Sequence, residues 1–164
     1  MNQETKNVGF LYPIIMAVLC LGICGFIFSM CWGGTNSSAD INDVADAVLP
    51  SVNLDNVKVA DANMIIKLYG IDPANYAGAV LYYPITNMEA DELFIVKLAD
   101  NSQKDAVVAA AQSRLATQLN NFDGYGDAQT AMLNASKIYA TGNYVIFVSG
   151  DKADESLSLF KKAL

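Results

Sequence analysis

The sequence predicts an α+β domain preceded by one apolar helix, in which helices pack on one face of an antiparallel sheet of about four strands. Three observations support this prediction. The run from Val8 to Trp32 carries no charged side chain. Beyond it, segments rich in β-branched and aromatic residues alternate with segments whose apolar residues recur at helical spacing. The predicted order, two helices followed twice by strand, strand and helix, is typical of a sheet covered on one face.

The apolar run is long enough to cross a bilayer, which needs roughly 20 helical residues. It has no polar face, unlike an amphipathic helix packed on a core. Tyr12 and Trp32 lie near its ends, where aromatic side chains settle among lipid headgroups. The alternative is a secretion signal cleaved after Gly33 or Gly34, but such signals have an apolar region of only about 7 to 15 residues. The sequence therefore favours a retained transmembrane helix over residues 8–32.

Flanking charges predict the orientation of this helix. Residues 1–7 form a short leader with Lys6 and the terminal amine, whereas the other flank has no basic residue before Lys58. Because basic residues tend to remain on the cytoplasmic side, we expect the leader in the cytoplasm. Residues 33–39 then form a short flexible linker, and residues 40–164 form an extracytoplasmic domain of a single-pass protein of the cell membrane.

All three cysteines lie in the apolar run and share one face of the predicted helix. Small apolar filler is the simplest interpretation. The alternative is self-association into a homodimer through Gly25 and Ser29, which have small-xxx-small spacing, with Cys31 placed for an intermolecular disulfide. Residues 33–164 contain no cysteine, so the domain has to be stabilised by its own core.

Two short helices are predicted at the start of the domain. Apolar residues recur at helical spacing over residues 41–48, behind a capping residue at Asp40 and before Pro50. A second helix is predicted from about residue 61 to residue 69, where Gly70 ends it. Two neighbouring antiparallel strands follow at residues 79–85 and 92–98.

The clearest helix is predicted over residues 102–121, with a capping box at 102–105. Its apolar stripe consists of Val108, Ala111, Leu115, Leu119 and Phe122.

A short helix is predicted at about 127–135. Two more strands then flank Gly142 and Asn143, a pair suited to a two-residue hairpin loop. The last helix is predicted to begin near Asp151.

Four short motifs together suggest a family. They are the Leu-Tyr-Gly-Ile-Asp turn at 68–72, Ala-Asp-Glu at 90–92, Tyr125 followed by Gln129, and Gly-Asn-Tyr at 142–144. As a set they resemble the bacterial domain-of-unknown-function family 4358, over about residues 55–164. The resemblance implies an exported protein held by a membrane helix or a lipid. It implies no activity, and it points to cell-envelope acylation and polysaccharide modification as a pathway.

Composition limits the chemistry that the domain can perform. The chain has no histidine, which removes the commonest general base, and the domain has no thiol for nucleophilic or zinc chemistry. A net charge of −7 argues against nucleic acid as a partner. We expect no cofactor and no metal site. The carboxylates Glu89, Asp91 and Glu92 lack the spacing of a calcium loop and are assigned to a solvated hairpin loop.

Aromatic and amide side chains are the candidate binding residues. Tyr125 lies between two glycines and Gln129 follows it, while Tyr82 and Tyr83 point to opposite faces of their strand. The sequence favours a non-enzymatic binding or scaffolding domain of the bacterial cell envelope, with a protein or glycan partner. The alternative is an accessory or hydrolytic component of polysaccharide acylation. An open aromatic sheet face would favour the first, and a pocket joining Tyr125, Gln129 and a carboxylate the second.

Overall fold

The computed structural model describes residues 34–164. The predicted membrane helix lies outside the described residues, together with the anchor-flank and self-association candidates Tyr12, Trp32, Gly25, Ser29 and Cys31. In the part of the chain that is described, no helix is both long and apolar enough for a membrane span.

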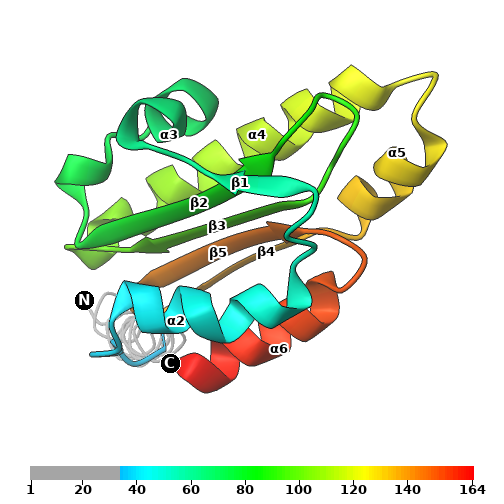
Figure 1. Cartoon of the computed structure of the whole chain (residues 1–164). Helices are drawn as coiled ribbons and strands as arrows, with labels where there is room; N and C mark the ends of the chain where they lie inside the picture. Colours follow the sequence, from blue (N-terminus) through cyan, green and yellow to red (C-terminus); the bar gives the residue numbers. More distant parts are fainter. Residues whose placement is uncertain (1–33) are drawn as a thin grey trace, which may run out of the picture. The chain divides into compact units, whose positions relative to one another are not determined.

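Residues 35–164 form one unit in which helices cover a five-stranded sheet (Figure 1). The strands are β1 (Val57–Val59), β2 (Gly78–Pro84), β3 (Glu92–Lys97), β4 (Lys137–Thr141) and β5 (Tyr144–Ser149). They pair antiparallel in the order β1-β2-β3-β5-β4. The helices of this unit are α2 (Ile41–Val48), α3 (Ala62–Tyr69), α4 (Lys104–Phe122), α5 (Asp127–Asn134) and α6 (Ala153–Ala163).

The helices cover both faces of the sheet, so the prediction that they pack on one face is wrong. Phe94 and Val96 of β3 point toward α3 and α4, whereas Leu93 and Ile95 point toward α2 and α6. A sheet solvated on one face would alternate apolar and polar residues. Strands β3 and β5 are instead buried along nearly their whole length, which requires apolar side chains on both faces.

The sheet also has one strand more than the sequence indicates. Strand β1 covers only three residues and pairs Lys58 with Tyr83 of β2. A segment this short shows no measurable alternation of apolar and polar residues. The other predicted strands are present, and Gly142, with a φ of 51°, turns the hairpin between β4 and β5.

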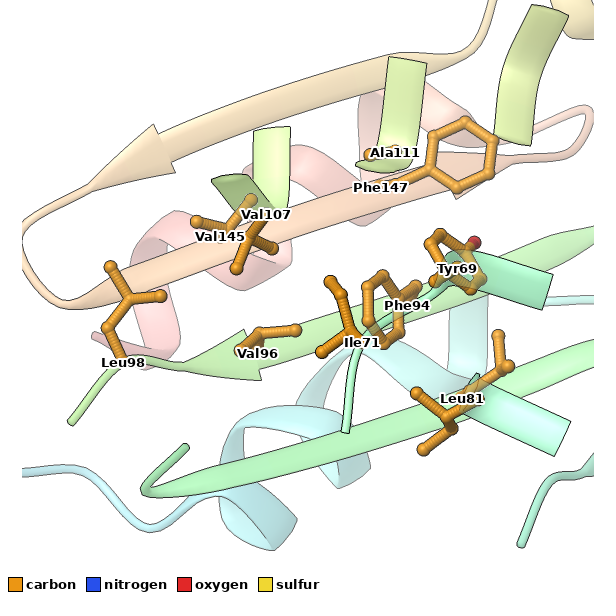
Figure 2. Packing of buried hydrophobic residues seen from close by; sticks show 11 residues of the cluster. Tyr69, Ile71, Leu81, Phe94, Val96, Leu98, Val107, Ala111, Val145 and Phe147 are labelled. Carbon is orange, nitrogen blue, oxygen red and sulfur yellow. The ribbon is translucent and has the colours of Figure 1, made fainter. Parts of the chain in front are cut away.

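Two apolar clusters fill the spaces between the sheet and its helices. The first, here called the α3/α4 cluster, joins Ile65 and Tyr69 of α3 and Val107 and Ala111 of α4 to one sheet face. Figure 2 shows Ala111 beside Phe147 and Tyr69 beside Phe94, and the rings of Tyr69 and Phe94 stack with centroids 3.9 Å apart. The second, the α2/α6 cluster, occupies the opposite face and includes Val44, Ile146 and Phe160.

The core-facing side of helix α4 includes the predicted stripe, because Ala111 and Phe122 are buried and the other members pack against the apolar clusters. Its buried side chains are Val107, Ala111, Gln118 and Phe122. The capping box predicted at 102–105 is wrong, because the box uses Asp100 and Gln103 and begins the short 3-10 helix Asn101–Gln103 that precedes α4. The predicted stripe members Val108, Leu115 and Leu119 are only half-buried. This side also carries polar side chains at Arg114 and Gln118, and these build the candidate site.

Residues 35–39, which the sequence assigns to a flexible linker, are held against the domain. The backbone N–H of Ser37 donates to Oδ1 of Asn143 at 2.8 Å, and Nδ2 of Asn143 donates to the Ser37 carbonyl at 3.2 Å. The carbonyl of Ala39 accepts from Nζ of Lys97 at 2.6 Å and from the hydroxyl of Tyr144 at 2.7 Å. We call residues 35–39 the strap.

Candidate binding pocket

A pocket of about 490 Å³ opens between α4, the end of β2 and the loop that joins β2 to β3. Its polar lining consists of Lys58, Thr86, Asn87, Glu89, Arg114, Gln118 and Asn121. Tyr83, Phe122 and Tyr125 supply aromatic surface. A volume of this size lies within the usual range for ligand sites in proteins.

Beneath the pocket lies a buried carboxylate, Glu92, at the start of β3. Its side chain has no exposed surface and forms an ion pair with Arg114, which is 12% exposed. Nε of Arg114 donates to Oε1 at 3.1 Å and Nη2 donates to Oε2 at 2.9 Å, in a bidentate arrangement. A buried charge requires such a partner, because leaving it unpaired costs several kcal/mol.

Two further donors complete the surroundings of Glu92. The hydroxyl of Tyr69 donates to Oε1 at 2.6 Å, and Nε2 of Gln118 donates to Oε2. Burial, and then the charge of Glu92, raise the pKa of Tyr69 well above its ordinary value. Burial alone would lower the pKa of Arg114, but the hydrogen bonds and charge of Glu92 outweigh it and raise that pKa.

The positive side chains of the pocket keep part of their binding capacity. Within the described residues, Nη1 of Arg114 has no hydrogen-bond acceptor, because the guanidinium binds Glu92 through Nε and Nη2. Nζ of Lys58 lies 5.0 Å from the centroid of the Tyr83 ring and forms no ion pair with a carboxylate of residues 34–164. Both cations therefore remain able to bind an anionic group.

The α4–α5 loop presents Tyr125 to solvent. Gly124 has a φ of 81°, which favours glycine, and a Cβ on Gly126 would lie 2.6 Å from the Phe122 ring. The two glycines thus permit a tight turn around Phe122. Tyr125 stays 61% exposed, with its ring centroid 6.0 Å from that of Phe122.

The same region fixes the loop between β2 and β3. Nε2 of Gln129 donates to the Met88 carbonyl at 3.1 Å. Ala90 packs with Phe122 and Leu133 in a small apolar cluster. The pocket wall is therefore attached to α5 by a hydrogen bond and by apolar contacts.

Of the four predicted binding residues, the pocket brings together Tyr83 and Tyr125. Tyr82 lies on the other sheet face, against the α2/α6 cluster. Gln129 is not part of the lining and supports the pocket through the Met88 carbonyl.

Sequence reasoning missed Lys58 and Arg114 as pocket residues. Arg114 is the only arginine of the chain and lies four residues before Gln118, in a helix with apolar residues three and four positions away. That placement is the signal that could have identified it. Lys58 gave no signal, because β1 is too short to predict.

The acidic residues before β3 do not form a solvated loop, which corrects the prediction for Asp91 and Glu92. Glu92 is bound to Arg114, and the buried Asp91 accepts a hydrogen bond from Nδ2 of Asn56 at 2.8 Å. Glu89 remains partly exposed at the pocket. Among residues 34–164, no group of three or more acidic, cysteine or histidine side chains is arranged to hold a metal ion.

The sequence of this domain matches a known family model over residues 50–150, described as a domain of unknown function (DUF4358). The chain belongs to the DUF4358 family. The matched residues contain β1 to β5 and therefore the whole sheet beneath the pocket. No curated protein and no solved structure matches the chain.

Glu92 of this DUF4358 domain is not placed to exchange a proton with a ligand in the pocket. Both oxygens of Glu92 accept hydrogen bonds from side chains of α3 and α4, so the carboxylate has no free position for a substrate proton. The open sheet face that would have carried aromatic contacts is absent from the described domain, because helices cover both faces. The pocket is therefore the candidate functional site.

Proposed function

We propose that this DUF4358 protein is a membrane-anchored, extracytoplasmic and non-enzymatic protein that binds another component of the bacterial cell envelope through the pocket. The apolar run over residues 8–32 supports the anchor, and the charge difference between its flanks supports export of the domain. The sequence resemblance supports a role in the cell envelope.

One observation carries the binding role. The buried carboxylate beneath the pocket, Glu92, is occupied by Arg114, Tyr69 and Gln118, while exposed aromatic, cationic and amide side chains surround the opening. A general acid or base needs a position from which it can exchange a proton with substrate. A hydrolytic role in polysaccharide acylation would have to use Glu89, the carboxylate that lines the pocket. Gln129, which the sequence places beside such a carboxylate, is not part of the lining, so this role has less support than binding.

Photo-crosslinking in intact cells tests the binding proposal. A photoreactive phenylalanine analogue at position 125 should give a defined crosslinked product, because Tyr125 is exposed at the pocket. The matched control carries the analogue at Asp46, an exposed position on α2 at the other sheet face. Equal crosslinking from both positions, or none from position 125, would contradict the proposed site.

The anchor and the orientation are tested with the same full chain. In cells without their outer wall, added protease should digest the domain, and alkaline extraction should leave the protein in the membrane fraction. The intact mass of the purified chain should include residues 8–32. A chain that lacks these residues, or that protease cannot reach, would overturn this part of the proposal.

A further inference from the structure

We propose that the pocket binds a peptide segment of a partner protein, in which a carboxylate lies next to an apolar side chain. This inference rests on the binding function proposed above and specifies the chemical class of the ligand. Three features of the pocket support it: its cations, its apolar rim and its amide groups.

The cations of the pocket stand out in an acidic chain. The net charge is −7, yet the pocket contains Lys58, without an ion pair in the described residues, and Arg114, with Nη1 unoccupied. Glu89 also lines the pocket but forms no ion pair with either cation. Since Arg114 is already paired with Glu92, Lys58 supplies the unpaired positive charge for a carboxylate, and Nη1 of Arg114 can add a hydrogen bond.

The rim of the pocket is apolar and exposed. The described residues include six large hydrophobic side chains with high exposure, and three of them, Ile85, Met88 and Tyr125, belong to the two loops that border the pocket, although only Ile85 and Tyr125 line it. Their exposed fractions are 44%, 54% and 61%. Exposed apolar side chains that gather beside a pocket mark an interaction site, and methionine adapts to different partner surfaces.

Side-chain amide groups are the third feature of the pocket that supports a peptide ligand. The side-chain amides of Asn87 and Asn121 are exposed at the pocket and make no hydrogen bonds within the described part of the chain, so each can bind a peptide N–H or C=O group. A glycan would use the tyrosine rings and the amides but would leave Ile85 and Met88 without an apolar partner. A peptide uses all three features, which is why we favour it over a glycan.

The test uses the full chain in phospholipid nanodiscs and a phage-displayed library of random peptides. We expect selected peptides to be enriched in Asp or Glu beside an apolar residue. A synthetic peptide of the selected sequence should bind the wild-type chain. The affinity of the chain for the peptide should fall at least tenfold when the acidic residue of the peptide is changed to the corresponding amide. It should fall by the same factor when the unchanged peptide is tested with the Lys58→Ala variant of the chain.

Two further variants control this experiment. Lys67→Ala removes an exposed lysine from α3, outside the pocket lining, and should bind the peptide like the wild type. Ile85→Asp should weaken binding through the rim and through repulsion of the peptide carboxylate. Lys58, Lys67 and Ile85 are exposed, so each variant should keep the fold, and its thermal unfolding curve verifies this.

The outcomes separate this inference from the proposed function. Failure to enrich any peptide, or equal affinity for wild type and Lys58→Ala, would overturn the peptide ligand. If position 125 then crosslinks to a glycan in cells, the binding function stands and only the ligand class is wrong. If position 125 gives no crosslink either, both proposals fail.

Discussion

At the scale of single residues, the decisive feature is a charge placed inside the core. Glu92 has no exposed surface and would destabilise the domain if left alone, so Arg114, Tyr69 and Gln118 all point their donors at it. This group connects β3 to α3 and α4. It also gives the pocket a fixed floor, because Arg114 and Gln118 belong to the lining.

Replacing Arg114 by methionine should destabilise the domain by about 3 to 5 kcal/mol, because Glu92 would stay buried without its cation. Urea unfolding of the purified chain measures the loss. The double variant Arg114→Met, Glu92→Met should be more stable than Arg114→Met alone, since it removes the uncompensated charge. A loss below about 1 kcal/mol in the single variant would contradict the role assigned to this ion pair.

At the scale of elements, each helix is positioned by what it meets across the sheet. Helix α4 turns a mixed polar and apolar face inward because Glu92 lies beneath its C-terminal half. The strap packs closely against the hairpin between β4 and β5. A Cβ on Gly142 would lie 2.2 Å from the Thr35 carbonyl oxygen. Asn143 accepts from and donates to the backbone of Ser37.

An Asn143→Ala substitution should release the strap. It removes two hydrogen bonds to Ser37, and we expect faster amide exchange in residues 36–39 and a loss of about 1 to 2 kcal/mol in unfolding free energy. Hydrogen-exchange mass spectrometry measures the first effect and urea unfolding the second. Asn53→Ala, in an exposed turn, serves as the control and should leave exchange in the strap unchanged. Unchanged exchange in Asn143→Ala would show that this asparagine does not hold the strap.

At the scale of the whole domain, the two apolar clusters share the same strands. Neighbouring residues of β3 and β5 alternate between the clusters, so neither helical layer can separate without exposing the sheet. Each cluster also contains a buried tyrosine, Tyr69 in one and Tyr144 in the other. Burial is the main cause that raises the pKa of both, that of Tyr144 to about 12.

Because of these two tyrosines, we expect the unfolding free energy of the domain to fall at high pH. The pKa of each tyrosine is higher in the folded state than the ordinary value near 10. The stability that each buried, protonated tyrosine contributes is therefore complete below pH 10 and is lost as pH rises through the folded-state pKa. Each should lower the unfolding free energy by about 1.4 kcal/mol per pH unit above 10. Urea unfolding between pH 9 and 11.5 should show a shallower decline for Tyr69→Phe. Tyr125→Phe, changed at an exposed position, should follow the wild type, and an unchanged slope in Tyr69→Phe would contradict the prediction.

Much of the fold could be predicted because local signals were strong. Gly70 ends α3 with a φ of 67°, Gly142 turns the last hairpin, and the apolar segments of β2 to β5 have the length and composition of strands. The pocket could be predicted only at Tyr83 and Tyr125. Lys58 and Arg114 reach it from segments that are far apart in the chain, and no local pattern records their meeting.

By itself the sequence determined the order and type of most elements and the absence of histidine and thiol chemistry from the domain, because propensity, turn residues and composition are local properties. Tertiary structure alone decided that helices cover both sheet faces, that Glu92 is buried rather than solvated, and that the strap is bound. Each of these depends on which distant side chain is available as a partner. The sequence records a glutamate in the same way whether its carboxylate faces water or pairs with an arginine. Glu92 can be buried at low cost because it pairs with Arg114.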